Sequence, residues 1–141
     1  MCIRASYSNL ALILKTNGGL LLLGVRRVYE KRKPTDGKLI LVDRLWPRGL
    51  RKSTNEVDIW LKDVAPSNEL RKWFAHDPSK WEEFKKRYRE ELKSNKKFKE
   101  LVEMAKNEDI TLVYAAKDTE HNNAVALAEF IKEELEKQNE K

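Results

Sequence analysis

Apolar residues follow two different spacings along this 141-residue chain. Three short runs rich in Val, Ile and Leu indicate strands at residues 25–29, 39–42 and 110–115. Elsewhere the apolar positions recur every three or four residues, which predicts five amphipathic helices. Their apolar residues are, in chain order, Val57, Trp60, Leu61 and Val64; Leu70, Trp73 and Phe74; Trp81, Phe84, Tyr88 and Leu92; Phe98, Leu101, Val102 and Ala105; and Ala124, Leu127, Ala128, Ile131 and Leu135.

Capping residues indicate where the first three helices begin. Ser53 and Glu56 have the spacing of a capping box, so the first predicted helix starts at Ser53, and Pro66 ends it. Ser67 is expected to cap the second helix, and Pro78 suits the first turn of the third. The whole pattern predicts a single three-layer α/β domain with a small, mostly parallel sheet and about five helices.

Polar loops follow two of the predicted strands. One begins after Val42 and the other after Ala115. Ligands of open α/β sheets bind outside the carboxyl ends of the strands, so parallel strands would bring the two loops to one site. The candidate residues of this site are Arg44, Trp46, Arg48, Gly49, Lys117, Asp118, His121 and Asn122.

The first of these loops has the chemistry of an anion site. Arg44 and Arg48 carry planar guanidinium groups that bind phosphate or carboxylate through two parallel hydrogen bonds. Gly49 would let the backbone approach a ligand closely, and Trp46 could stack on an arginine or cover the ligand. In the alternative interpretation the arginines form structural ion pairs with Asp43 and Asp118, and the tryptophan packs on the end of the sheet.

The second loop could contribute both charge and proton transfer. Lys117 adds a cation, and Asn122 stands where it could cap the last helix, whose amino end favours anions. His121 could act as a general acid or base near neutral pH, with Asp118 orienting it. The alternative is that Asp118 and Asn122 are turn and capping residues and that His121 is exposed.

Several blocks of the sequence match the pattern of a known protein family, and they occur in the same order along the chain. They begin at Arg27-Val28-Tyr29, continue through residues 42–49 and 60–84, and end at Tyr114-Ala115-Ala116-Lys117-Asp118 with Asn122. Over about residues 26 to 135 the chain resembles the YeaO-like proteins, small bacterial and archaeal proteins with a domain of unknown function. The resemblance implies a single α/β domain and carries no established activity.

Several classes of function are excluded by residues that the sequence lacks. Cys2 is the only cysteine, so neither a disulfide within the chain nor a Cys-x5-Arg phosphatase site can form, and the two histidines give no metal-type spacing. There is neither a glycine-rich phosphate loop nor a dinucleotide fingerprint, and no apolar run is long enough to span a membrane. No cofactor or metal is therefore expected, and a reducing cytoplasm suits the single thiol.

The charge of the chain permits nucleic acid as a partner. Lys and Arg outnumber Asp and Glu by 29 to 23, which gives a net charge of +6. The positive charge gathers at residues 26–33 and 44–52, so a basic face for RNA or DNA is one hypothesis, and a solvated surface is the alternative. The abundance of Lys and Glu is typical of heat-adapted proteins.

Residues 1–24 differ in character from the rest of the chain. They carry only two charges, Arg4 and Lys15, and they precede the family resemblance. One hypothesis is a translated leader, because Gly18-Gly19 can be encoded by a ribosome-binding sequence, with Leu22, Leu23 or Val25 as the true start. The alternatives are an added edge strand or a floppy tail. The expected division is therefore an atypical extension over 1–24, the domain over 25–137 and a polar tail over 138–141.

The leading hypothesis from the sequence is a cytoplasmic protein that binds a phosphate-bearing or other anionic small ligand. Arg44, Arg48, Lys117 and the start of the last helix would hold the anion. A hydrolase or transferase that uses His121 and Asp118 is the second hypothesis, and a nucleic-acid module is the third. The sequence leaves the oligomeric state open.

Overall fold

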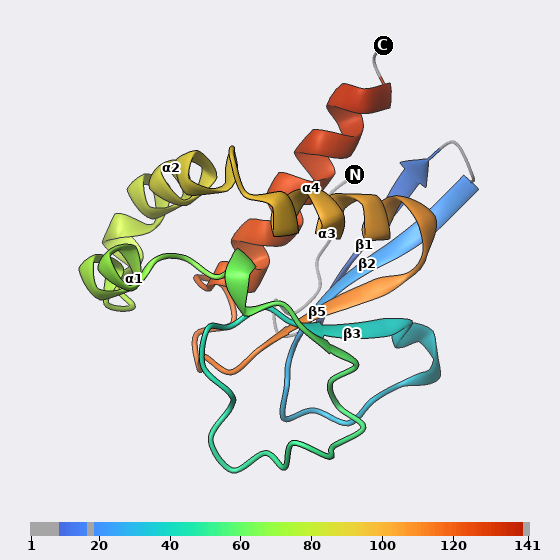
Figure 1. The fold of residues 1–141 in the computed structure, drawn as a ribbon, viewed down its shortest axis with the longest axis horizontal. Helices are drawn as coiled ribbons and strands as arrows, with labels where there is room; N and C mark the ends of the chain where they lie inside the picture. Colours follow the sequence, from blue (N-terminus) through green and yellow to red (C-terminus); the bar gives the residue numbers. More distant parts are fainter. Residues whose placement is uncertain (1–8, 17–18, 140–141) are drawn as a thin grey trace.

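The predicted strands form the centre of one five-stranded sheet (Figure 1). The computed structural model describes residues 9–16 and 19–139. The strands lie in the order β1-β2-β5-β3-β4, β1 is antiparallel to β2, and the other three neighbouring pairs are parallel. Their bounds are β1 (Asn9–Thr16), β2 (Gly19–Arg27), β3 (Lys38–Leu41), β4 (Ile59–Trp60) and β5 (Ile110–Tyr114).

The apolar stripes of four α-helices form the main core on one face of this sheet, where α3 and α4 contact the strands and α1 packs on α2. They are α1 (Asn68–Phe74), α2 (Trp81–Leu92), α3 (Lys96–Asn107) and α4 (Asn123–Asn139). The second to fifth predicted helices are therefore confirmed. The Ser67 hydroxyl accepts from the Leu70 amide at 3.1 Å and caps α1, as expected. No helix in the described part of the chain is long and apolar enough to cross a membrane.

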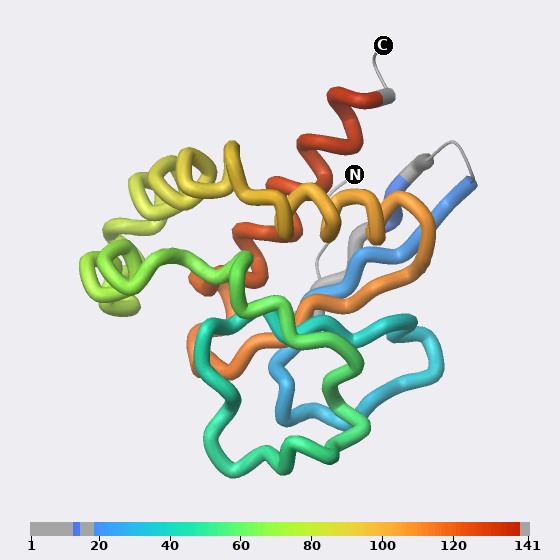
Figure 2. Tube along the Cα trace, viewed as in Figure 1, coloured from blue at the N-terminus to red at the C-terminus, as the bar shows by residue number. Residues whose placement is uncertain are grey.

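The opposite face of the sheet is covered by a loop. Residues 42–58 make the long excursion that Figure 2 shows below the sheet, on the side away from α3. Together with the strands, this loop encloses a second group of apolar side chains, which we call the loop-side cluster. It contains the buried Val28, Leu39, Leu41 and Val113, against which Trp46, Leu50, Val57, Trp60 and Ala115 pack. The layer beyond this face is thus a loop, whereas a three-layer domain would ordinarily carry helices there.

The helix predicted from Ser53 does not form. Residues 51–58 are turns, and Ile59–Trp60 is strand β4, followed by a 3-10 turn at Lys62–Val64. The backbone amides here bond to β3, because Asp58 donates to the Leu39 carbonyl at 2.8 Å and Leu61 to that of Leu41 at 2.9 Å. Pairing with the sheet outweighs the helical spacing of the apolar residues.

The amino-terminal extension contributes an edge strand to the sheet. β1 pairs along its length with β2, from Asn9 opposite Arg26 to Thr16 opposite Gly19. This is the edge-strand alternative for the residues described. Residues 1–8 and 17–18 lie outside the described part of the chain, and the translated leader stays a prediction.

Candidate functional site

The two polar loops lie at the same edge of the sheet. β3 and β5 are parallel neighbours, with Leu41 opposite Val113, so their carboxyl ends coincide. Two side chains then tie the loops together. The Asp43 carboxylate accepts from the Ala115 amide at 2.8 Å, and the Asn123 side chain donates to the Val42 carbonyl at 2.8 Å. The convergence expected of the loops therefore follows from the strand order and is fixed by side-chain contacts.

Asp43 is the most enclosed carboxylate of this edge. Burial raises its pKa, although hydrogen bonds from the Ala115 amide and the Asn123 side chain act in the opposite direction. The sequence interpretation gave Asp43 only the role of an ion-pair partner for the arginines. In the described structure it bonds instead to the backbone of the next loop, and no Arg44 or Arg48 ion pair is present there.

Arg44 points toward the segment before α1. Its guanidinium donates to the Ala65 carbonyl at 3.3 Å and to the Pro66 carbonyl at 3.3 and 3.4 Å. These distances are at the long end for such bonds, and both acceptors are neutral. No carboxylate of the described residues therefore pairs with Arg44, which lies beside the site on the helix-covered side of the sheet.

Arg48 occupies the corner of a tight turn. The Leu50 amide donates to the Pro47 carbonyl at 3.3 Å, and Gly49 adopts a φ of +82° at the third position, where a type II turn requires a positive φ. A Cβ on Gly49 would meet nothing within 4 Å, so its glycine serves the turn and not a close approach within the protein. The Arg48 side chain is exposed and makes no hydrogen bond or ion pair with the described residues.

Trp46 anchors this turn to the sheet. Its indole N–H donates to the Leu50 carbonyl at 2.6 Å, and its ring meets the Trp60 ring edge-on, with centroids 5.4 Å apart. It also packs in the loop-side cluster. Trp46 therefore packs on the sheet, as the alternative interpretation expected. In this position its side chain holds the turn that carries Arg48.

Two residues that the sequence interpretation did not single out connect the turn to the second loop. The Tyr29 hydroxyl donates to the Arg48 carbonyl at 2.8 Å, and the Arg27 guanidinium lies 5.0 Å from the centre of the Tyr29 ring. Arg27 also donates to the carbonyls of Ala115 and Ala116, both at 3.0 Å. The chain of contacts thus runs from the Arg48 turn to the residue before Lys117.

Lys117 is exposed at the start of the second loop and has no side-chain partner among residues 9–16 and 19–139. The next residue, Asp118, organises the loop. Its carboxylate accepts from the amides of Glu120 and His121, both at 2.9 Å, and Oδ2 lies 3.1 Å from Nδ1 of His121. Burial alone would raise the pKa of Asp118, but these hydrogen bonds outweigh it and hold the pKa below its ordinary value.

His121 and Asn122 complete the loop. The His121 ring meets the Trp81 ring edge-on, with centroids 5.4 Å apart, and it is partly buried. The alternative interpretation expected a fully exposed His121. Asn122 is buried, and its side chain accepts from the Val125 amide at 2.9 Å, which makes it the cap of α4. It also donates to the Asp118 carbonyl at 2.9 Å. Asn122 therefore has the structural role that the sequence offered as its alternative.

The residues missed from the sequence share one signal. Arg27 and Tyr29, and also Asp43, whose backbone contact was not foreseen, all lie within a few residues of a strand's carboxyl end. Arg27 is the last residue of β2 and Tyr29 lies two residues beyond it. The loop after this strand was not considered, because its charges were grouped into a general basic cluster. Within the described residues, no group of three or more His, Cys, Asp and Glu is arranged to hold a metal ion.

Comparisons with known proteins place the chain among uncharacterised relatives. The sequence model of a family with the description "Inactive DUF488-N3 subclade" matches residues 22–141. The uncharacterised protein Rv3073c of Mycobacterium tuberculosis is 44% identical over 107 residues, which cover 76% of this chain and 91% of that protein. The uncharacterised protein YeaO of Escherichia coli is 41% identical over 108 residues, or 76% of this chain and 94% of the relative. No solved structure gives a significant match.

Proposed function

The chain belongs to the YeaO-like family and matches the family model described as "Inactive DUF488-N3 subclade", and from this premise we propose that it binds a small phosphate-bearing or other anionic ligand. The ligand would lie at the carboxyl ends of β2, β3 and β5. We also propose that the protein lies in the cytoplasm, where reducing conditions suit its single thiol, Cys2.

One observation carries the proposal: Arg48 and Lys117 are exposed cations without partners among the described residues, on two loops that are held together. Arg48 stands at the corner of a turn fixed by Trp46 and Tyr29, so its backbone is positioned before any ligand arrives. Pre-positioned cations lose less entropy on binding an anion. Arg44 adds positive charge from behind, since its bonds go to neutral carbonyls.

Binding without turnover is favoured over catalysis for two reasons. The matching family model carries the word "Inactive" in its description. In addition, the only thiol is Cys2, and Ser67 is occupied as a helix cap and as a donor to Glu91 at 2.6 Å. The Ser67 hydroxyl is therefore engaged, and the sequence has no Cys-x5-Arg phosphatase motif.

Replacing Arg48 by Ala tests the proposal. Phosphate affinity is expected to fall about tenfold or more, because a charge-assisted hydrogen-bond pair is lost. The melting temperature should hardly change, since the side chain is exposed and bonds to nothing described. Calorimetric titration with inorganic phosphate measures the first quantity, and thermal unfolding measures the second.

Arg51 on the same loop provides the matched control, because its side chain is also exposed and makes no hydrogen bond or ion pair with the described residues. Arg51→Ala should change phosphate affinity less than Arg48→Ala does. Retained affinity in Arg48→Ala, together with a large loss of stability, would instead assign Arg48 a structural role.

An enzymatic role has one specific observation in its favour, the contact of 3.1 Å between Asp118 and His121. A carboxylate that orients an imidazole leaves Nε2 available for proton transfer, and the nearby arginines could stabilise developing negative charge. On this account, phosphoester or nucleotide hydrolysis by the wild type should fall by at least a hundredfold in His121→Ala. Equal rates in both proteins would remove the role.

A further inference from the structure

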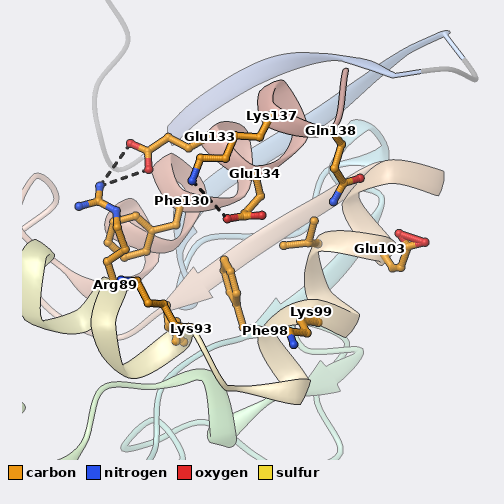
Figure 3. Close-up of a pocket in the computed structure, with 12 residues that line it drawn as sticks. Arg89, Lys93, Phe98, Lys99, Glu103, Phe130, Glu133, Glu134, Lys137 and Gln138 are labelled. Atoms are coloured by element: carbon orange, nitrogen blue, oxygen red, sulfur yellow. Dashed lines mark hydrogen bonds and ion pairs between the residues drawn. The ribbon is translucent and has the colours of Figure 1, made fainter. Parts of the chain in front are cut away.

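A hollow of about 460 Å³ lies between α2, α3 and α4, apart from the strand ends (Figure 3). It is lined by the second half of α4, from Phe130 to Gln138, whereas α4 meets the candidate anion site at its first residues. The volume is within the range of small-molecule sites. Its floor is apolar and consists of Leu92, Phe98, Val102 and Phe130.

One charged side chain at the rim of this hollow has no ion-pair partner. Each of its three carboxylates is matched by a lysine or arginine. The pairs are Glu103 with Lys106 at 3.5 Å, Glu133 with Arg89 at 3.2 Å and Glu134 with Lys137 at 3.8 Å. The side-chain ammonium group of Lys99, by contrast, makes no ion pair or hydrogen bond with any described residue. The rim therefore carries a cation without a partner, and no carboxylate without one.

The wall between α2 and α4 is fixed by two contacts of one side chain. Arg89 pairs with Glu133, and its guanidinium lies 4.6 Å from the centre of the Phe130 ring. Figure 3 shows this pair on one side of the hollow, with Phe98 between Lys93 and Glu134. Arg89 is engaged in this way, Lys93 pairs with Glu90 at 2.6 Å, and Lys137 pairs with Glu134. Lys99 is therefore the lining cation left to meet a ligand.

We propose that this hollow binds a small amphiphilic carboxylate. The apolar body of the ligand would cover Phe98 and Phe130, and its carboxylate would face Lys99. A cationic ligand would have to displace one of the three existing ion pairs, and a neutral ligand would leave the lysine uncompensated. The site is independent of the proposed anion site, so either one can fail without the other.

The test compares octanoate with octanol, which share the same chain length but differ in charge. Both probes are titrated into the isotope-labelled full chain and followed by NMR. Octanoate is expected to shift the signals of Leu92, Phe98, Val102 and Phe130, and to bind about threefold more tightly than octanol, as one partly exposed charge contact allows. Absence of shifts at these floor residues with octanoate would overturn the proposal.

Substitution of Lys99 decides whether the charge is recognised. Lys99→Ala should bring the affinity for octanoate down to that for octanol. Lys96 is the matched control, because it lies on the same helix, is exposed and does not line the hollow. Lys96→Ala should keep the preference for octanoate. An unchanged preference in Lys99→Ala, or its equal loss in both variants, would contradict the assignment.

Discussion

Asp36→Ala is expected to lower the free energy of unfolding by about 3 kcal/mol, because it strands a buried cation. Arg26 is only 2% exposed, and its guanidinium lies 2.7 Å from the Asp36 carboxylate. Its other described bond is a donation to the Lys31 carbonyl at 2.8 Å, and its Nε has no partner among the described residues. Without Asp36 the charge has no described counterion. Urea unfolding measures the loss.

Two further variants separate this effect from a general sensitivity to substitution. Asp63 is exposed and its carboxylate has no partner in the described structure, so Asp63→Ala should change stability by less than about 0.5 kcal/mol. The double variant Arg26→Met with Asp36→Ala should recover part of the loss, because the buried charge is then removed as well. A loss below about 1 kcal/mol in Asp36→Ala would contradict the importance of this pair.

Asp43→Ala is expected to cost about 2 kcal/mol and to loosen the contact between the two site loops. The substitution leaves the Ala115 amide without its 2.8 Å partner and removes a neighbour of the Asn123 side chain. An amide left unsatisfied inside the protein costs roughly this amount. Urea unfolding gives the cost, and amide hydrogen exchange at Ala115 reports the loosening. Unchanged exchange would show that Asp43 does not hold the loops together.

The pH dependence of Asp43 has a definite sign. Burial raises its pKa, so the folded protein holds this proton more tightly than the unfolded chain does. The stability that it contributes is present at low pH and is lost as the pH rises from the ordinary aspartate range through the raised pKa. The stability of wild type relative to Asp43→Asn should therefore fall across that window. A difference that rises with pH would mean that the pKa is lowered.

The four helices that the sequence predicted correctly are those whose stability is decided locally. Phe84, Tyr88 and Leu92 keep a helical stripe along α2, and the cap at Ser67 acts within one turn. The failed helix at Ser53 has a similar spacing of apolar residues. This segment does not form a helix because the backbone amides of Asp58 and Leu61 bond to β3, which is distant in sequence. No local pattern carries that information.

The candidate site divides in the same way. The strand ends at Val42 and Ala115 were visible as apolar runs that become polar, and the parallel neighbours β3 and β5 bring them together. The hydrogen-bond partners of the residues at these strand ends could not be predicted from the sequence. Asp43 bonds to a backbone amide 72 residues away, and Arg27 reaches carbonyls across the sheet edge. Such contacts follow from strand order, which the sequence did not give.

These placements also change the roles within the proposed site. Trp46 and Asn122 were expected beside a ligand, but one anchors the Arg48 turn and the other caps α4. The proposed contact with the anion therefore rests mainly on Arg48 and Lys117. The backbones of their loops are linked through Tyr29 and Arg27, so the fold positions the two residues that carry these cations.

An amide-resolved NMR titration with inorganic phosphate, a mononucleotide and a short RNA tests this account most directly. Phosphate and the mononucleotide are expected to shift only the signals of residues 44–52 and 117–124. Shifts spread over the basic residues 26–33 and 44–52 with RNA alone, weakening steeply with salt, would indicate a nucleic-acid module instead. Absence of shifts in both loops with all three probes would contradict an anion site at the strand ends.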